Sequence, residues 1–253
     1  MIDLQNRLTE IIKRLKAGED PELVKQDARE LLSSLDPQDL TVAEEQLVEA
    51  GLEPEDLRHL CSIHMEMLAG EVEKLKEQTG PGHVLHTLVE EHEHILATLD
   101  ELERVNQAVQ QMDSYDPNRD EFDRLKNAAH HLVEAESHHE REEEVLFPEA
   151  EKHGIWGPPQ VMRMEHTQLR QRKHDLKELA ENAGEMDFET FKKKLDTTSK
   201  FILLTLRDHI FKENNILYPA ALQSIEDEAT WNDLKAKCDS IGYCCFTPEA
   251  KKQ

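Results

Sequence analysis

Two segments of the chain carry the same arrangement of possible metal ligands, a His followed four residues later by a Glu. One segment begins at His138 and reads HHEREEEVLFPEA, and the other begins at His209 and reads HIFKENNILYPAA, so that Glu142 matches Glu213 at an offset of 71. Side chains four positions apart on a helix lie on one face, one turn from each other. Each segment can therefore bring an imidazole and a carboxylate to the same point, a pair that suits a transition metal.

A weaker repeat, at an offset of 74, pairs Glu91-His92 with Glu165-His166. The combined donor set has no thiolate, and it favours a pair of iron or manganese ions over a structural zinc. Buried carboxylates are costly unless they are paired or coordinated, so two Glu in a predicted core favour a dinuclear cation site. If both Glu bridge the metals, one position on each ion stays open for a small ligand. The candidate ligands are His92, His138, Glu142, His166, His209 and Glu213.

Apolar periodicity indicates which of these side chains point inward. His92 lies in the middle of an apolar stripe, whereas His94 falls on a polar face. In the segment that begins at His138, periodicity alone places His139 and Glu143 at least as near the apolar centre as His138 and Glu142. The repeat favours the latter pair, because the second copy has Ile and Asn at the two competing positions.

Other polar residues near these positions have alternative interpretations. We expect His86, His131, Glu134 and Arg170 to support the ligands rather than to bind metal directly, although Arg170 could also lie at the rim of the bundle. The i,i+4 His–Glu pairs could instead be surface ion pairs, but that interpretation leaves their inward placement unexplained. Cysteines could form a second metal or redox site, but their spacing matches no standard ligand pattern. These are Cys61 (with His64), Cys238, Cys244 and Cys245.

The elements that must position these residues are helices, since the apolar period is helical nearly everywhere and no segment has the pattern of a strand. Short, turn-rich separators between long helices imply antiparallel neighbours, hence an all-α, up-down-up-down four-helix bundle. The predicted long helices span 83–111, 120–152, 159–182 and 188–219.

The QTGPG stretch that ends at Gly82 is the best candidate for a linker. We therefore predict a small helical domain at 1–78, the bundle at 83–222, and a short helix with a tail at 223–253.

Composition excludes several classes of function. The 253 residues include 30 Lys and Arg against 54 Asp and Glu, for a formal charge of −24. This charge disfavours binding to nucleic acid or to an anionic membrane. Four Cys are too few for a disulfide scaffold, no apolar segment resembles a signal peptide, and no apolar run is long enough to span a membrane. We expect a reduced, cytoplasmic protein, and no signature of a catalytic nucleophile is present.

Residues 83–222 resemble the hemerythrin-like (HHE cation-binding) family. The resemblance rests on the two His-x-x-x-Glu motifs with their LFP and LYP tails, together with His92 and His166. Residues 1–75, which include GEDPELVK and LRHLCSIH, look like the domain of unknown function that precedes such modules in bacteria and archaea. The IGYCCFTP tail is similar to the tail of the same proteins.

The resemblance implies a carboxylate-bridged site for two non-haem iron ions, with manganese or zinc as the alternatives. Oxygen-carrying hemerythrins have a second His where this chain has Arg170, and an Asp where it has Glu213. The set of four His and two Glu looks more like the repair-of-iron-centres proteins and the F-box iron-sensing hemerythrin domain. Reversible oxygen transport is therefore not implied.

Three functions remain open at this point. The first is a di-iron protein that binds or reacts with O2, NO or peroxide in sensing or in defence against oxidative or nitrosative stress. The second is a non-catalytic, iron-dependent regulator that acts on a protein partner through the N-terminal domain. The third is an iron donor for the repair of iron centres. Whether the protein is an enzyme is not decided by the sequence.

Overall fold

The computed structural model describes Arg14, residues 71–244 and residues 246–247. The chain divides into two compact units, Met1–Glu73 and Lys74–Gln253, and the fold described below is that of the second unit. Most of the predicted N-terminal helical domain, with Cys61 and His64, lies outside the described residues.

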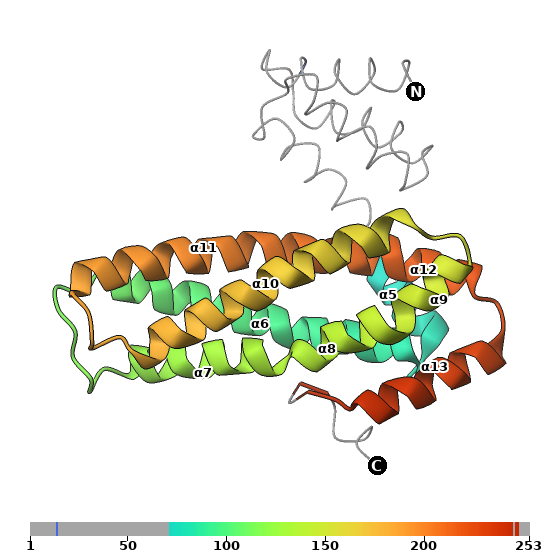
Figure 1. Cartoon of the computed structure of the whole chain (residues 1–253), viewed down its shortest axis with the longest axis horizontal. Helices are drawn as coiled ribbons and strands as arrows, with labels where there is room; N and C mark the ends of the chain where they lie inside the picture. Colours follow the sequence, from blue (N-terminus) through green and yellow to red (C-terminus); the bar gives the residue numbers. More distant parts are fainter. Residues whose placement is uncertain (1–13, 15–70, 245, 248–253) are drawn as a thin grey trace. The chain divides into compact units, whose positions relative to one another are not determined.

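Four long helical rods form the bundle (Figure 1). They are built on α6 (Val84–Gln110), α7 (Asp120–Glu134), α10 (Gly157–Glu181) and α11 (Phe188–Lys212). Helix α6 packs against α7, α7 against α10, α10 against α11, and α11 against α6. Each rod thus touches its neighbours in sequence and the ring closes, which confirms the predicted up-down-up-down bundle.

The second and fourth rods continue through short segments that change the helix type. After α7 come α8 (Glu136–Arg141), the π-helical turn η1 (Glu142–Leu146) and α9 (Phe147–Lys152). After α11 come the π-helical turn η2 (Glu213–Leu217) and α12 (Tyr218–Ser224). The two repeated motifs therefore fold alike, and each π-helical turn begins at the Glu of its motif.

The repeated prolines give a physical reason for the π-helical turns. Pro148 and Pro219 lack an N–H group, and in an α-helix each ring would clash with the carbonyl four residues before it. The turn ahead of each proline contains one extra residue, and the N–H of Phe147 donates to the carbonyl of Glu142. The equivalent bond joins Tyr218 to Glu213.

Capping side chains fix where the helices begin. The Nδ1 atom of His83 accepts a hydrogen bond from the N–H of Leu85 at 3.2 Å, at the start of α6. Asp187 accepts from the N–H of Thr190 at 3.0 Å, at the start of α11. The predicted linker contains Gly80 at φ 64°, in the left-handed region that favours glycine, after α5 (Glu71–Thr79).

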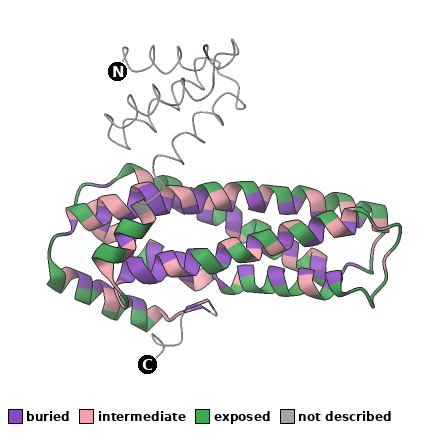
Figure 2. Cartoon of the chain, turned by 180° about the vertical axis from the view of Figure 1, so that it is seen from behind, coloured by how far each residue is buried: buried purple, intermediate pink, exposed green. Residues whose placement is uncertain are grey.

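The interior of the bundle has two parts. At the end formed by the α6–α7 and α10–α11 connections, the core is apolar throughout, and it includes Leu99, Leu125, Leu176 and Leu195 with no exposed side-chain surface. At the other end the buried residues include many polar and charged side chains. Buried residues occur along the whole length of the bundle (Figure 2). Helix α13 (Glu228–Ile241) packs against α8, α6 and η1 at the polar end.

No helix in the described part of the chain is both long enough and apolar enough to cross a membrane.

Candidate metal centre

The six predicted ligands all lie inside the polar end of the bundle. Four rods contribute them: α6, α8 with η1, α10, and α11 with η2. Each of these residues is at most 1% exposed, although imidazoles and carboxylates are hydrophilic. These buried candidate ligands are His92, His138, Glu142, His166, His209 and Glu213.

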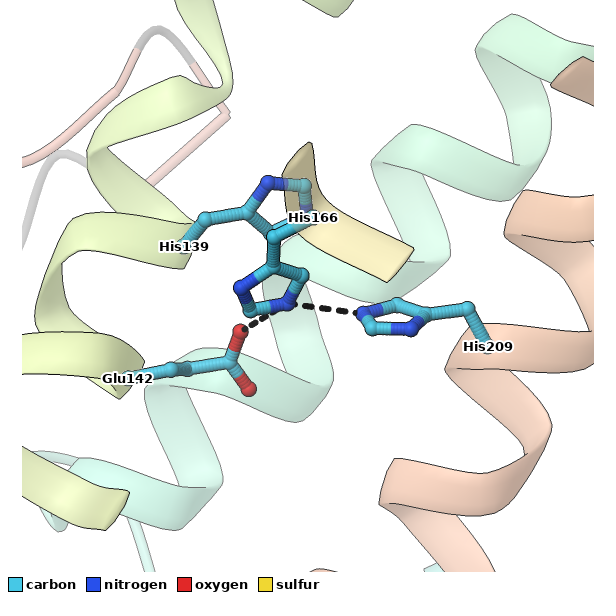
Figure 3. Close-up of side chains that lie close together, drawn as sticks. All are labelled: His139, Glu142, His166 and His209. Carbon is cyan, nitrogen blue, oxygen red and sulfur yellow. Dashed lines mark hydrogen bonds and ion pairs between the residues drawn. The ribbon is translucent and has the colours of Figure 1, made fainter. Parts of the chain in front are cut away.

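The ligand atoms form two groups. In each group the atoms lie within 4.8 Å of one another. One group consists of His92, His138 and Glu213. The other contains a residue that the repeat had led us to set aside, His139, together with Glu142, His166 and His209 (Figure 3).

Short distances connect the two groups. The Nε2 atom of His209 lies 2.8 Å from Glu213 Oε1 and 2.9 Å from His166 Nε2. His166 Nε2 also lies 3.5 Å from Glu142 Oε2. On the other side, His92 Nε2 lies 3.2 Å from Glu213 Oε2. Glu213 therefore faces both groups, with one carboxylate oxygen toward each, as a bridging ligand would.

A separate acceptor holds the outer nitrogen of each imidazole. The Nδ1 atoms of His92, His138, His166 and His209 donate to Asn214, Glu91, Glu143 and Glu165 at 2.7–2.8 Å. A proton on Nδ1 leaves Nε2 with a free lone pair, which is the form that binds a metal. The arrangement fixes both the tautomer and the direction of each ring.

The supporting residues follow the internal repeat. Glu91 and Glu165 precede His92 and His166, and each supports a His on another rod. Glu143 and Asn214 are likewise equivalent at the offset of 71. These positions are visible as repeats in the sequence, but no role was predicted for them, since a repeat reveals equivalence and not which side chains meet in space.

Glu91 accepts hydrogen bonds from three side chains. Its Oε2 atom accepts from His138 and, at 2.6 Å, from Arg141, which is only 1% exposed. Its Oε1 atom accepts from Thr247 in the C-terminal tail. Burial alone would raise the pKa of Glu91, but His138 and Arg141 outweigh it and lower the pKa to about 2. Glu91 is therefore a charged, fixed acceptor.

The electrostatics at the centre call for a cation. Burial and the facing charge of Glu213 raise the pKa of Glu142 well above its usual range. Burial would also raise the pKa of Glu213, but the charge of His209 and the closeness of the neighbouring imidazoles lower it. Burial opposes protonation of His209, yet Glu213 and Glu165 raise its pKa to about 9. Protons thus balance two carboxylates that a bound cation would balance instead.

Buried carboxylate oxygens without hydrogen-bond partners indicate whether a metal fits these residues. Glu142 Oε2 and both carboxylate oxygens of Glu213 are buried without a hydrogen-bond partner. Such orphaned acceptors are expensive in a protein interior. They face imidazole Nε2 atoms, so coordination would satisfy both kinds of atom at once, and the donor set fits a transition-metal pair.

The residues predicted to support the ligands have different surroundings. Arg170 donates to Glu136 at 2.9 Å and to Glu143 at 3.4 Å, and so touches the acceptor of His166. His86 is buried, and its Nε2 lies 3.3 Å from Glu90. His131 and Glu134 are exposed, which differs from the expectation, because a helix break at Ala135 separates them from the ligand-bearing turn.

The cysteines that the structure describes have ordinary packing roles. Cys238 and Cys244 are free and buried, and burial raises the pKa of the Cys238 thiol to about 11. A buried thiol with a raised pKa is neither a ready metal ligand nor a nucleophile. Within the described residues, neither thiol belongs to a group of potential metal ligands.

Comparison with known families agrees with this geometry. Residues 83–221, more than half of the chain, match the family described as Hemerythrin HHE cation binding domain. The chain therefore belongs to the hemerythrin HHE cation-binding family. Residues 8–74 match a second family, described as a family of unknown function (DUF438). A search of curated proteins found no match.

Proposed function

We propose that the protein holds two non-haem iron ions and binds or reacts with a small ligand, O2, NO or peroxide, in sensing or stress defence. The observation that carries the proposal is the pair of buried groups of possible ligands, which face each other through Glu142 Oε2 and both oxygens of Glu213, atoms without a hydrogen-bond partner. Imidazole and carboxylate donors suit iron. An iron pair can exchange two electrons with a small oxidant, which zinc cannot.

The residues that surround the ligands restrict what can reach them. The ring of Phe147 stacks against His166 with centroids 5.7 Å apart, and the ring of Tyr218 stacks against His92 at 5.6 Å. These aromatics occupy equivalent places in the repeat, and both are fully buried. Their apolar surfaces shield the imidazoles from bulk water.

Tyr218 places a hydroxyl group at one side of the site. Its hydroxyl donates to Glu142 Oε1 at 2.5 Å and lies 3.5 Å from His138 Nε2. Burial, with the charge of Glu142, raises the pKa of Tyr218 well above its usual range, so the hydroxyl keeps its proton. We assign Tyr218 the role of orienting Glu142.

Metal analysis and optical spectroscopy of iron-loaded protein test the proposal. We expect about two irons per chain, as the two ligand groups require, with near-ultraviolet bands of an oxo bridge that change on addition of azide. Purified protein that takes up no iron, or iron without such bands, would contradict the proposal.

An iron-dependent regulator is the second candidate, because metal binding at this site would be coupled to stability. Two buried carboxylates that need a cation should make the iron-loaded bundle more stable than the metal-free one. Melting temperature and protease digestion patterns of both forms test this candidate. Identical behaviour of the two forms would exclude it and leave the small-ligand proposal standing.

A further inference from the structure

We infer that His139 is a fifth imidazole ligand, on the metal that His166 and His209 hold. The inference rests on the proposed function, since it needs a metal at this site. It assigns neighbouring histidines to different metals, His138 to one and His139 to the other.

His139 is buried among the ligand atoms of one group. It is 2% exposed, and its ligand atom lies within 4.8 Å of those of Glu142, His166 and His209. In Figure 3 its ring lies beside that of His166, and the two rings are stacked with centroids 3.9 Å apart. The centroid of His138, by contrast, lies 4.6 Å from that of His92, in the other group.

His139 is also held in the same way as the other four imidazoles. Its Nδ1 donates to Glu136 Oε1 at 3.0 Å, so its Nε2 is the nitrogen left for a metal. A core His that only fills space does not require a charged acceptor. Partial burial of the Glu136 carboxylate costs free energy, and two cations offset that cost.

Those two cations come from the third rod. Arg170 donates to Glu136 Oε1 at 2.9 Å, and Lys173 donates to Glu136 Oε2 at 3.3 Å. Lys173 is itself only 2% exposed, which is rare for lysine. Arg170 also reaches Glu143, so one guanidinium fixes the acceptors of His139 and His166, two imidazoles of the same group. Arg170 therefore positions the carboxylates that orient the candidate ligands.

The helix break at Ala135 explains how adjacent histidines both point inward. Ala135 has ψ 0°, and its carbonyl accepts from the N–H of His138, a bond across three residues instead of four. This tighter turn shifts the phase of α8 relative to α7. Neighbouring side chains on a helix diverge by about 100°, so the two rings can face two different metals.

His139 also breaks the symmetry of the repeat. The equivalent position in the second copy is Ile210, and that of Glu136 is Arg207, which pairs with acidic residues of α6 at the surface. One metal would therefore have three imidazoles and the other two. The metal near His92 and His138, where the Tyr218 hydroxyl lies, would keep more room for a small ligand.

Proton NMR of cobalt-loaded wild-type protein tests the inference without a substitution. Each imidazole bound to high-spin Co(II) through Nε2 gives one strongly shifted, exchangeable Nδ1–H signal, and the hydrogen bonds at Nδ1 slow its exchange. We expect five such signals. Four signals would overturn the inference and leave the proposed function intact, whereas no shifted signals would contradict the metal site itself.

Substitution gives an independent test. We expect His139→Ala to lower the affinity for one of the two irons more than the 10- to 100-fold that loss of a supporting residue costs, and His131→Ala, at an exposed position, to leave it unchanged. Two irons bound with unchanged affinity and an unchanged Mössbauer spectrum in His139→Ala would overturn the inference. If His139→Ala does not fold, the count of signals in the wild-type protein decides.

Discussion

Glu142 and Glu143 approach the same imidazole, that of His166, from opposite ends. Glu142 Oε2 lies 3.5 Å from Nε2, and Glu143 Oε1 accepts from Nδ1 at 2.8 Å. Glu142 has no exposed surface, whereas the side chain of Glu143 is 26% exposed. Adjacent carboxylates thus have different roles, one as a candidate ligand and the other as the residue that orients a ligand.

Substitution of these neighbours should separate the two roles. Glu142→Ala removes a candidate ligand carboxylate and is expected to abolish binding of at least one iron. Glu143→Ala removes only a supporting acceptor and should weaken iron binding by about 10- to 100-fold. Iron titrations of both variants give the comparison, and equal losses would mean that the ligand on this turn has been wrongly chosen.

The buried pair of Glu91 and Arg141 should matter for stability. Arg141→Met leaves the Glu91 carboxylate buried without its cation, which is expected to lower the free energy of unfolding by about 3–5 kcal/mol. The double substitution Arg141→Met with Glu91→Gln removes both charges and should recover most of that loss. Urea unfolding measures both, and a single variant as stable as the wild-type protein would contradict the assignment.

The lowered pKa of His83 predicts that the protein loses stability in mild acid. Burial, with the charge of His86, lowers its pKa to about 4, against 6.5 in the unfolded chain. The unfolded state therefore binds more protons between these values, so the His83 contribution is complete above pH 6.5 and is lost as the pH falls toward 4.

His83→Asn keeps a capping side chain without the titration. Between pH 7 and pH 4 we expect the free energy of unfolding to fall in both proteins. Because His83 is only half-buried, the fall should be smaller in the variant than in the wild-type protein by about 1–2 kcal/mol. Urea unfolding of both proteins at both pH values measures this difference. The contributions of the other histidines are the same in the two proteins and therefore cancel. Parallel pH profiles would rule out the cap as the source.

The apolar end of the bundle should support stability without taking part in metal binding. Leu99 is fully buried, whereas Leu204 is 71% exposed. Leu99→Ala is expected to cost about 2–5 kcal/mol, and Leu204→Ala should change the free energy of unfolding by less than about 0.5 kcal/mol. Iron stoichiometry should stay the same in both, and a loss of iron in Leu99→Ala at a temperature where it is folded would contradict this division.

The fold could be predicted from the sequence because helical periodicity is a local property. The four long rods follow the predicted helices, and the QTGPG turn was visible in the residues themselves. The π-helical turns at Glu142 and Glu213 could not be predicted, because a single inserted residue leaves little trace in a periodic pattern.

The predicted ligands illustrate what an internal repeat can and cannot reveal. It identified His138 and Glu142 over their neighbours, and the structure places both side chains inside the bundle. It also led us to set aside His139, since a repeat reports only what the two copies share. The break at Ala135, which turns His139 inward, occurs in one copy alone.

Anomalous diffraction from crystals of iron-loaded protein, collected on both sides of the iron absorption edge, tests the central claim most directly. We expect two iron peaks per chain. One lies among His92, His138 and Glu213, and the other lies among Glu142, His166 and His209. A bundle interior without iron peaks, or iron bound only at surface carboxylates, would contradict the claim.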